Sequence, residues 1–552
     1  MNKLFRIYFF LTVIFLPACT LNVSAEPEIF IRFNQIGYLN EEPKTAVVLS
    51  NHSLIGKTIN ILDFKTKKSV LKVPFNSDRG TYGAFQYSYI VDFSELRDNG
   101  DYQFEFSTQR TTAFKIGNNV YSGVADSLLT FFLVQRCGYT NPHLHKTCHI
   151  SDATRLIDQN KNIFQQYDAT GGWHDAGDYV KFLNTTAFST YMLLFAYEFD
   201  PQKFSFDNNN NNVPDLLEEA KIGLDWLLRA NYKDSKLITQ VQDLRDHDVG
   251  WRMPEDDPLA FDRPAYLGIG KNLIGIYAAA LSMGGRIWKD KMQLPDFADK
   301  CISVAERFYS LRNRVQDIDS SGSGMYIDNS FEGKMALGAA ELYLATNKKF
   351  YLDEAMVYAD SANSDHWWSW GNINSLAHYK LAQFNSKYAD YIKNNLDGFD
   401  KNSEKNLFGK GTIPSWGTNV TLLGITLQNI LYQKLKGFSP YERVASIQKD
   451  FVLGRNPWGI SFISGFGKNF SRNLHHQVFH LKKTIRGGFA AGPASKDLIE
   501  KSKIPFEKFD TSARFQTKEA YYRDDRMDYI SNEPTITGNA TAIFVFGNLM
   551  LK

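Results

Sequence analysis

Hydrophobic and polar residues alternate with a period of two along the first part of the chain, from Glu28 to about Ile116. Short apolar runs such as IFIRF, TAVVLS, TINILDF and DYQFEF are separated by turn-forming residues, among them Gly37 and Asn99-Gly100. This alternation is typical of short strands with one buried face. We therefore predict a small β-sandwich over residues 26–117.

The period changes after Tyr121, where apolar residues recur at intervals of three and four, as on one face of a helix. This period predicts twelve helices, near residues 121–132, 186–199, 215–231, 269–284, 294–311, 332–346, 350–362, 370–383, 386–396, 418–436, 441–453 and 538–551. Such a series suits an α/α barrel, so we predict a mainly α, (α/α)6-barrel domain over residues 118–552. Long loops in a compact domain are usually functional. The longest expected here are 137–185, 232–268 and 454–537.

The first residues have the pattern of a secretory signal peptide. Lys3 and Arg6 precede the apolar run of residues 7–16, and small residues end the segment. We expect residues 1–25 to be removed from a secreted or periplasmic protein. The alternative is a lipid anchor on Cys19, because the letters LPAC resemble a bacterial lipoprotein box. No later stretch approaches the ~18 apolar residues of a membrane span, so none is predicted.

Composition narrows the class of protein. The chain has 62 Lys and Arg residues against 60 Asp and Glu residues, a formal net charge of +2, which excludes nucleic-acid binding by bulk charge. Hydrophobic residues at 43% and charged residues at 22% exclude a disordered chain. Aromatic residues make up 14% of the chain, more than a core needs, and stacking on sugar rings is one use for the excess.

Four carboxylates lie in two of the long loops. The segment GGWHDAGDYVKF places Asp175 and Asp178 three residues apart, and YYRDDRMDYISNEPTITGNA supplies Asp524 and Glu533 ahead of the last helix. Carboxylates from distant segments can act as acid and base on opposite sides of a glycosidic bond. Helix capping, calcium ligation or simple solvation are the alternatives for each acid taken alone.

Several spaced motifs resemble those of glycoside hydrolase family 9, the inverting β-1,4-glucanases, over nearly all of the chain. GWHDAGD is similar to the family's base loop, SFISGFGKNFSRNLHHQ to its histidine signature and YRDDRMDYISNEPTITGNA to its acid signature. Further matches are QRCG at 135–138, WRMPEDD at 251–257, RPAY at 263–266, WGTN at 416–419 and LGRNP at 453–457. The N-terminal IRFNQIGYL similarly resembles the immunoglobulin-like domain that precedes the barrel in one branch of the family.

The resemblance implies a role for each acid. Asp178 would be the general base, Asp175 its partner in holding the nucleophilic water and Glu533 the general acid. Asp524 would support the acid loop. Because the acid must stay protonated near neutral pH, we expect burial or neighbouring acids to raise the pKa of Glu533, while Asp178 stays ionised. His475 matches the signature's active-site histidine, and its alternative is a loop histidine packed on a helix.

The resemblance also suggests which side chains contact sugar. The expected substrate contacts are Trp251, Trp370, Trp416, Tyr529 and Gln477. Buried packing is the alternative for each aromatic residue. Gln477 departs from the pattern, because the family usually has arginine there, so we expect weaker sugar binding on one side of the cleaved bond.

Cys137, Cys148, His149 and His174 form a candidate metal site. Their spacing does not by itself indicate zinc, and a disulfide between the two cysteines is the alternative in a secreted protein. The resemblance implies a structural Cys2His2 zinc site, because relatives with the immunoglobulin-like domain have one at the matching positions. His143 and His145 are nearby substitutes, and Cys301 is expected to be a buried free thiol.

The segment DNNNNNVPDLLE matches the template of a calcium loop at positions 1, 3, 5, 7, 9 and 12. The corresponding ligands are Asp207, Asn209, Asn211, the carbonyl of Val213, Asp215 and Glu218. Asn212 stands where the template has glycine, and asparagine is the next most tolerant residue for a left-handed turn. The alternative is a solvated loop in which Asp215 caps the following helix.

These inferences combine into one expected function. We predict a secreted, monomeric, inverting glycoside hydrolase that cleaves β-1,4-glucosidic bonds in cellulose-like glucans or cello-oligosaccharides, with the activity of an endo-β-1,4-glucanase. One alternative is an exo-acting relative that cleaves a modified sugar such as glucosamine. Another is a non-catalytic carbohydrate-binding barrel, against which the joint presence of Asp175, Asp178 and Glu533 argues.

Overall fold

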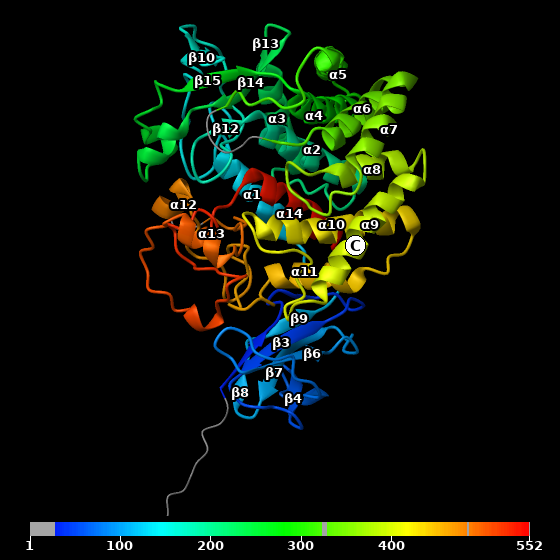
Figure 1. The fold of residues 1–552 in the computed structure, drawn as a ribbon, viewed down its shortest axis with the longest axis vertical. Helices are drawn as coiled ribbons and strands as arrows, with labels where there is room; N and C mark the ends of the chain where they lie inside the picture. Colours follow the sequence, from blue (N-terminus) through cyan, green and yellow to red (C-terminus); the bar gives the residue numbers. More distant parts are fainter. Residues whose placement is uncertain (1–27, 323–327, 483–484, 551–552) are drawn as a thin grey trace, which may run out of the picture.

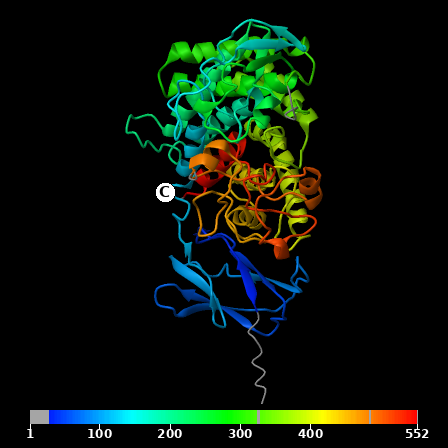
Figure 2. The ribbon, with the colours of Figure 1, turned by 90° about the vertical axis from the view of Figure 1, so that its left-hand side faces the viewer.

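The computed structural model describes residues 28–322, 328–482 and 485–550. The expected signal peptide, with Cys19, lies outside the described residues. A strand-rich unit forms one end of the molecule and a larger helical unit forms the rest (Figures 1 and 2). The predicted mainly α protein with an N-terminal β-sandwich is therefore confirmed.

The strand-rich unit consists of two facing sheets. One sheet has the strand order β1-β3-β6, and the other has the order β2-β9-β7-β4-β5, with β8 beside β7. Phe93, Phe104 and Phe114 pack between the sheets and are almost completely buried. The strands are β1 (Ile29–Arg32), β2 (Gly37–Tyr38), β3 (Thr45–Ser50), β4 (Thr58–Asp63), β5 (Ser69–Pro74), β6 (Tyr87–Asp92), β7 (Gly100–Phe106), β8 (Gln109–Arg110) and β9 (Phe114–Ile116).

The helical unit is a barrel of two concentric rings. Within the described residues, an inner ring closes because each of its helices contacts the next and the last contacts the first. The inner helices are α2 (Leu183–Phe199), α4 (Lys271–Asp290), α6 (Glu332–Thr346), α8 (Asn374–Ala382), α10 (Thr418–Lys436) and α14 (Ile536–Asn548). The outer helices are α1 (Val124–Gln135), α3 (Asp215–Arg229), α5 (Pro295–Ser310), α7 (Lys349–Ala362), α9 (Lys387–Ser403) and α11 (Glu442–Val452).

Burial explains which helices are inside. The inner helix α2 is buried at every position from Leu183 to Ala196, whereas the outer helices α3 and α5 each bury one stripe. A helix that is apolar all round belongs in a core, and an amphipathic helix belongs at a surface. The twelve predicted helices all exist, and Cys301 is a buried free thiol on α5.

The structure differs from the sequence prediction mainly inside the long loops. The predicted helix 370–383 begins only at Asn374, because Ser369 and Asn372 form a hydrogen-bonded turn ahead of it. The long loops also contain a third sheet, with the order β11-β10-β15-β14-β12 and β13 beside β14. The strands are β10 (Arg155–Asp158), β11 (Lys161–Ile163), β12 (Lys181–Phe182), β13 (Asn231–Tyr232), β14 (Lys236–Val241) and β15 (Pro264–Gly268). The short helices are η1 (Leu244–Asp248), η2 (Pro254–Asp256), η3 (Leu311–Asn313), α12 (Gln477–Lys482), α13 (Lys496–Lys501) and η4 (Ala513–Phe515).

A buried ionic contact joins the sandwich to the barrel. Lys449 of α11 places its Nζ 2.7 Å from Oε1 of Glu42, and Asn34 Nδ2 donates to Asp450 Oδ1 at 2.8 Å. Val47 and Leu49 of β3 belong to the same apolar core as the barrel helices. The two units therefore share both a core and a charge network.

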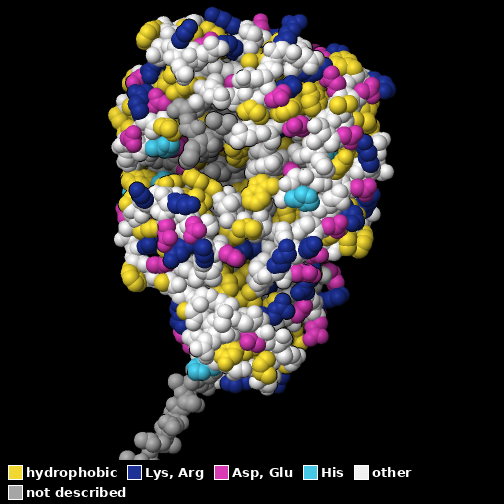
Figure 3. Space-filling view, viewed as in Figure 1, with side chains coloured by type: hydrophobic (Ala, Val, Ile, Leu, Met, Phe, Trp, Pro, Cys, Tyr) yellow, Lys and Arg dark blue, Asp and Glu magenta, His cyan; other side chains and the backbone are white. Residues whose placement is uncertain are grey.

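The surface agrees with a nearly neutral chain. Basic and acidic side chains are interspersed over the face shown in Figure 3, without a broad field of either sign. In the part of the chain that the structure describes, no helix combines the length and the apolar character needed to cross a membrane.

Candidate active site

The loop between β11 and β12 carries Asp175 and Asp178. A close backbone contact holds this loop against the segment that contains His475. A Cβ atom on Gly177 would lie 2.3 Å from the carbonyl oxygen of His475, so only glycine fits there. Gln477 N donates to the Gly177 carbonyl at 3.0 Å. The motif's glycine between Asp175 and Asp178 is thus required by packing, and two segments far apart in sequence meet at the base loop.

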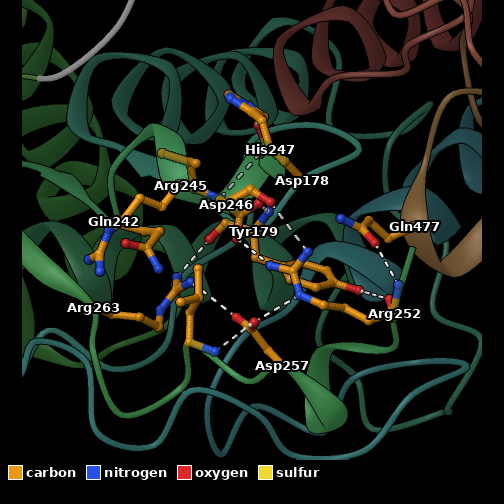
Figure 4. A network of polar contacts seen from close by, with 12 residues as sticks. Asp178, Tyr179, Gln242, Arg245, Asp246, His247, Arg252, Asp257, Arg263 and Gln477 are labelled. Carbon is orange, nitrogen blue, oxygen red and sulfur yellow. Dashed lines mark hydrogen bonds and ion pairs between the residues drawn. The ribbon is translucent and has the colours of Figure 1, made fainter. Parts of the chain in front are cut away.

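Asp178 is held by a histidine that the sequence analysis did not single out. His247, on η1, places Nε2 2.7 Å from Asp178 Oδ2 (Figure 4). Val180 N donates to Asp178 Oδ1 at 3.2 Å. Burial alone would raise the pKa of Asp178, but the hydrogen bond and charge of His247 lower it on balance. In return, the hydrogen bond that His247 donates to Asp178 raises the pKa of His247 to about 9. Asp178 therefore stays ionised at neutral pH.

Glu533 lies against the same loop. Its Oε1 accepts a hydrogen bond from Gly177 N at 3.3 Å, and the Asp175 carbonyl accepts one from Ile536 N at 3.0 Å. Burial, followed by the charges of Asp178 and Asp175, raises the pKa of Glu533 well above its usual value. These surroundings favour the protonated form of Glu533 and the ionised form of Asp178, which are the directions that the sequence analysis expected.

Asp524 and His475 fix the loops around the acid. Asp524 Oδ1 accepts from Arg472 N and Asn473 N, each at 3.0 Å, so it anchors the histidine segment to the acid segment. His475 Nδ1 lies 2.6 Å from the Arg526 carbonyl, which can only accept, so Nδ1 carries the proton. Because burial lowers the pKa of His475, its ring is neutral and Nε2 remains an acceptor.

The expected substrate-binding residues occupy different surroundings. Trp251 packs its ring against His475 at a centroid distance of 5.1 Å, and Tyr529 lies 6.0 Å from the same ring. Trp416 is 42% exposed and lies 5.7 Å from Tyr529, so these aromatic rings form a continuous group. Trp370 packs on the barrel core instead.

Gln477 is turned into the protein. Its side chain is 7% exposed, and Oε1 accepts a hydrogen bond from the backbone N–H of Arg252 at 2.8 Å (Figure 4). The amide oxygen therefore joins two loops, a contact that sequence alone could not indicate.

The cysteine and histidine residues of the candidate metal site come together. One ligand atom from each of Cys137, Cys148, His149 and His174 lies within 4.8 Å of the others, and all four residues are buried. Both cysteines are free thiols, so the disulfide alternative is not realised. His149 Nδ1 faces His174 Nε2 at 3.1 Å. Two facing imidazole nitrogens and two thiols fit a tetrahedral zinc ion.

His145 does not substitute for these ligands. Its Nδ1 lies 2.8 Å from the Lys146 carbonyl and its Nε2 2.9 Å from the Val134 carbonyl. Both ring nitrogens thus face backbone oxygens. His143 likewise lies outside the ligand group.

The predicted calcium loop is compact. Glu218 of α3 accepts a hydrogen bond from Asn209 Nδ2 at 2.9 Å and another from Asn211 Nδ2. Asp207 Oδ2 accepts from Asn212 N at 2.8 Å, and Asn212 has a φ of +67°, the left-handed conformation expected at that position. Asp215 turns away, to Asn208. Four of the six expected ligand residues therefore converge.

Comparison with known proteins agrees with this geometry. Residues 121–546 match the model of glycosyl hydrolase family 9, and residues 26–111 match the cellulase N-terminal ig-like domain. The chain therefore belongs to glycosyl hydrolase family 9 and is a glucan hydrolase with an N-terminal immunoglobulin-like domain.

Individual proteins are similar to this chain over most of its length. Endoglucanase D of Acetivibrio thermocellus is 26% identical over 81% of this chain and 74% of its own length. A cellodextrinase of Butyrivibrio fibrisolvens is 24% identical over 94% of this chain and 99% of its own. The solved structure of a Zn-binding triple mutant of family 9 endoglucanase J30 superposes with a TM-score of 0.79 at 25% identity, covering 93% of this chain and 99% of that one.

Proposed function

We propose that the protein is a secreted, inverting endo-β-1,4-glucanase that acts on cellulose-like glucans and their oligosaccharides. The observation that carries the proposal is the placing of Glu533 against the buried loop that carries Asp178, where their surroundings raise the pKa of Glu533 and lower that of Asp178. Hydrolysis with inversion needs that combination, an acid for the leaving oxygen and a base for water on the opposite face of the sugar.

Each side chain then has a defined step. Glu533 donates its proton to the glycosidic oxygen as the bond to the anomeric carbon breaks. Asp178 removes a proton from the attacking water, whose oxygen bonds to the anomeric carbon, and Asp175 helps to hold that water. His247 keeps Asp178 ionised through its 2.7 Å contact. Neutral His475, beside Trp251 and Tyr529, offers Nε2 to a sugar hydroxyl.

The substitution Glu533→Gln tests the acid. The amide keeps the shape of the side chain but has no proton to transfer, and general acid catalysis contributes about 10²- to 10⁴-fold. We expect kcat on cellotetraose to fall by that factor with the fold unchanged. Glu500→Gln, on the exposed face of α13, is the matched control and should keep full activity. More than about half of wild-type activity in Glu533→Gln would remove it from the mechanism.

Product analysis distinguishes the modes of attack. An endoglucanase shortens soluble β-glucan quickly while releasing few ends, whereas a cellodextrinase-like enzyme releases small products from the start. Chito-oligosaccharides in the same panel test the glucosamine alternative, which the buried position of Gln477 does not favour.

We also propose that Cys137, Cys148, His149 and His174 hold a structural zinc ion. Four protein ligands close the coordination shell, so the ion would brace the base loop next to Asp175 rather than bind substrate. The convergence of the four ligand atoms supports this.

A structural calcium ion at the Asp207 loop is part of the same proposal. Asn209 and Asn211 donate hydrogen bonds to Glu218, and the backbone N–H of Asn211 donates to Asp207, so these four residues lie close together, which supports it. Oxygen ligands of this kind suit a hard cation.

Secretion through residues 1–25 and a monomeric state complete the proposal. The mass of the mature protein tests the cleavage site, and a diacylated Cys19 in the membrane fraction would favour the lipid anchor. Light scattering gives the oligomeric state.

A further inference from the structure

Arg252 lies between the candidate zinc site and the base loop. Its side chain is buried and bridges two carboxylates, with Nε 2.8 Å from Asp257 Oδ1 and Nη2 2.6 Å from Asp246 Oδ1 (Figure 4). Nη1 also donates to the carbonyl of Gly250 at 3.1 Å. The planar fork of arginine suits such a bridge, which the single ammonium of lysine would not reproduce.

On the metal side, Asp257 orients a ligand. Its Oδ2 lies 3.0 Å from Nε2 of His149, and the other nitrogen of that ring, Nδ1, faces the remaining zinc ligands. A carboxylate that accepts the second N–H of a ligating histidine fixes the tautomer and the direction of the ring. Asp257 is therefore placed to hold His149 ready for the ion.

On the catalytic side, Asp246 is connected to two residues next to Asp178, namely Tyr179 and His247. Its Oδ2 accepts a hydrogen bond at 3.0 Å from the backbone N–H of Tyr179, the residue after Asp178. Asp246 also directly precedes His247, which contacts Asp178 at 2.7 Å. Displacement of Asp246 would thus move the base and its histidine partner together.

We propose that Arg252 and Asp257 are positioning residues that couple the geometry of the zinc site to the position of the general base. The chain of contacts runs from His149 through Asp257, Arg252 and Asp246 to the base loop. Neither residue touches the reacting atoms. The catalytic half of the inference rests on the proposed function, whereas the metal half does not.

Zinc affinity tests the metal half. Asp257→Asn offers one acceptor oxygen for two donors, His149 Nε2 and Arg252 Nε, so competition with a chromogenic chelator should show zinc binding weakened by about 10- to 100-fold. Asp262→Asn is the matched control, because Asp262 is half-exposed in the same loop and contacts Arg155 and Arg245. Equal affinities in both variants would overturn the inference.

Coupling tests the whole chain of contacts. Arg252→Lys should lower kcat with little change in KM and should also weaken zinc binding, although no ligand is altered. Removing zinc should lower kcat by a smaller factor in Arg252→Lys than in wild type, because the connection is already loosened. Arg245→Lys, on the exposed side of the loop, should behave as wild type.

The outcomes separate the two claims. The coupling would be overturned if removing zinc lowered kcat by the same factor in wild type and in Arg252→Lys. Unchanged zinc affinity in Arg252→Lys would overturn it as well. If Arg252→Lys does not fold by circular dichroism, the milder Asp257→Asn takes its place in the same comparison. Wild-type protein without activity on any β-glucan would contradict the proposed function, and the zinc affinities would still decide the inference.

Discussion

At the scale of single residues, the proposed mechanism depends on keeping Glu533 and Asp178 in opposite protonation states. His247 is the residue that holds Asp178 ionised, and its replacement by glutamine removes a positive charge 2.7 Å from the base. Glu533 and Asp246 are further acidic neighbours of Asp178, and neither offers it a positive charge. Without His247, burial and Glu533 would raise the pKa of Asp178.

The expected result is a change in the pH profile of kcat. The base works above its pKa and is lost as the pH falls through it, so a raised pKa moves the acidic limb of the profile to higher pH. A charged hydrogen bond of about 1.5 to 3 kcal/mol corresponds to about one to two pH units. The exposed His52→Gln serves as control. An acidic limb that stays in place in His247→Gln would show that this contact does not tune the base.

Spaced motifs in the sequence predict catalytic roles for Asp175, Asp178 and Glu533, and the structure places Glu533 against the loop that carries the two aspartates. Sequence did not identify His247, Asp246 or Arg252, although the last two lie in or beside the recognised WRMPEDD segment. Their roles depend on which partners the fold brings near, and a buried arginine and a surface arginine look alike in sequence. For the same reason Gln477, expected to face sugar, is found bonded to a backbone N–H.

At the scale of elements, periodicity predicted every helix of the two rings but not the sheet in the long loops. Strands such as β12 and β13 are two residues long, too short to show an alternation. Their existence depends on pairing with β14, which is a tertiary event. The start of α8 differs from the prediction because a hydrogen-bonded turn precedes the helix.

The loop before α3 gives a prediction at this scale. Calcium at a free concentration about a hundred times its Kd should stabilise the wild type by about 2.7 kcal/mol, seen as a higher Tm. Glu218→Gln removes the carboxylate on which Asn209 and Asn211 converge, so it should abolish the rise. Glu404→Gln, exposed on the barrel, should retain it. If calcium does not change the Tm of the wild type, the proposed calcium site is wrong and the alternative, a solvated loop, holds.

At the scale of the whole molecule, the sandwich and the barrel are held together by buried charge. Lys449 contacts Glu42 at 2.7 Å and Asp450 at 3.1 Å, so Lys449→Met leaves two buried carboxylates without their ammonium partner. We expect the free energy of unfolding to fall by about 3 to 5 kcal/mol in urea titrations. Lys393→Met, which removes a half-exposed pair with Asp397, should cost less than about 1 kcal/mol. Similar losses in both variants would mean that the buried contact contributes no more to the free energy of unfolding than an exposed ion pair does.

The stereochemistry of hydrolysis tests the central claim most directly. If Asp178 activates water on the face opposite the bond that Glu533 protonates, the anomeric carbon must invert. Proton NMR of cellotetraose hydrolysis, recorded before mutarotation, should therefore show the α-anomer of the new reducing end first. A β-anomer formed first would contradict the account, because it requires a covalent intermediate and a nucleophile in place of a base.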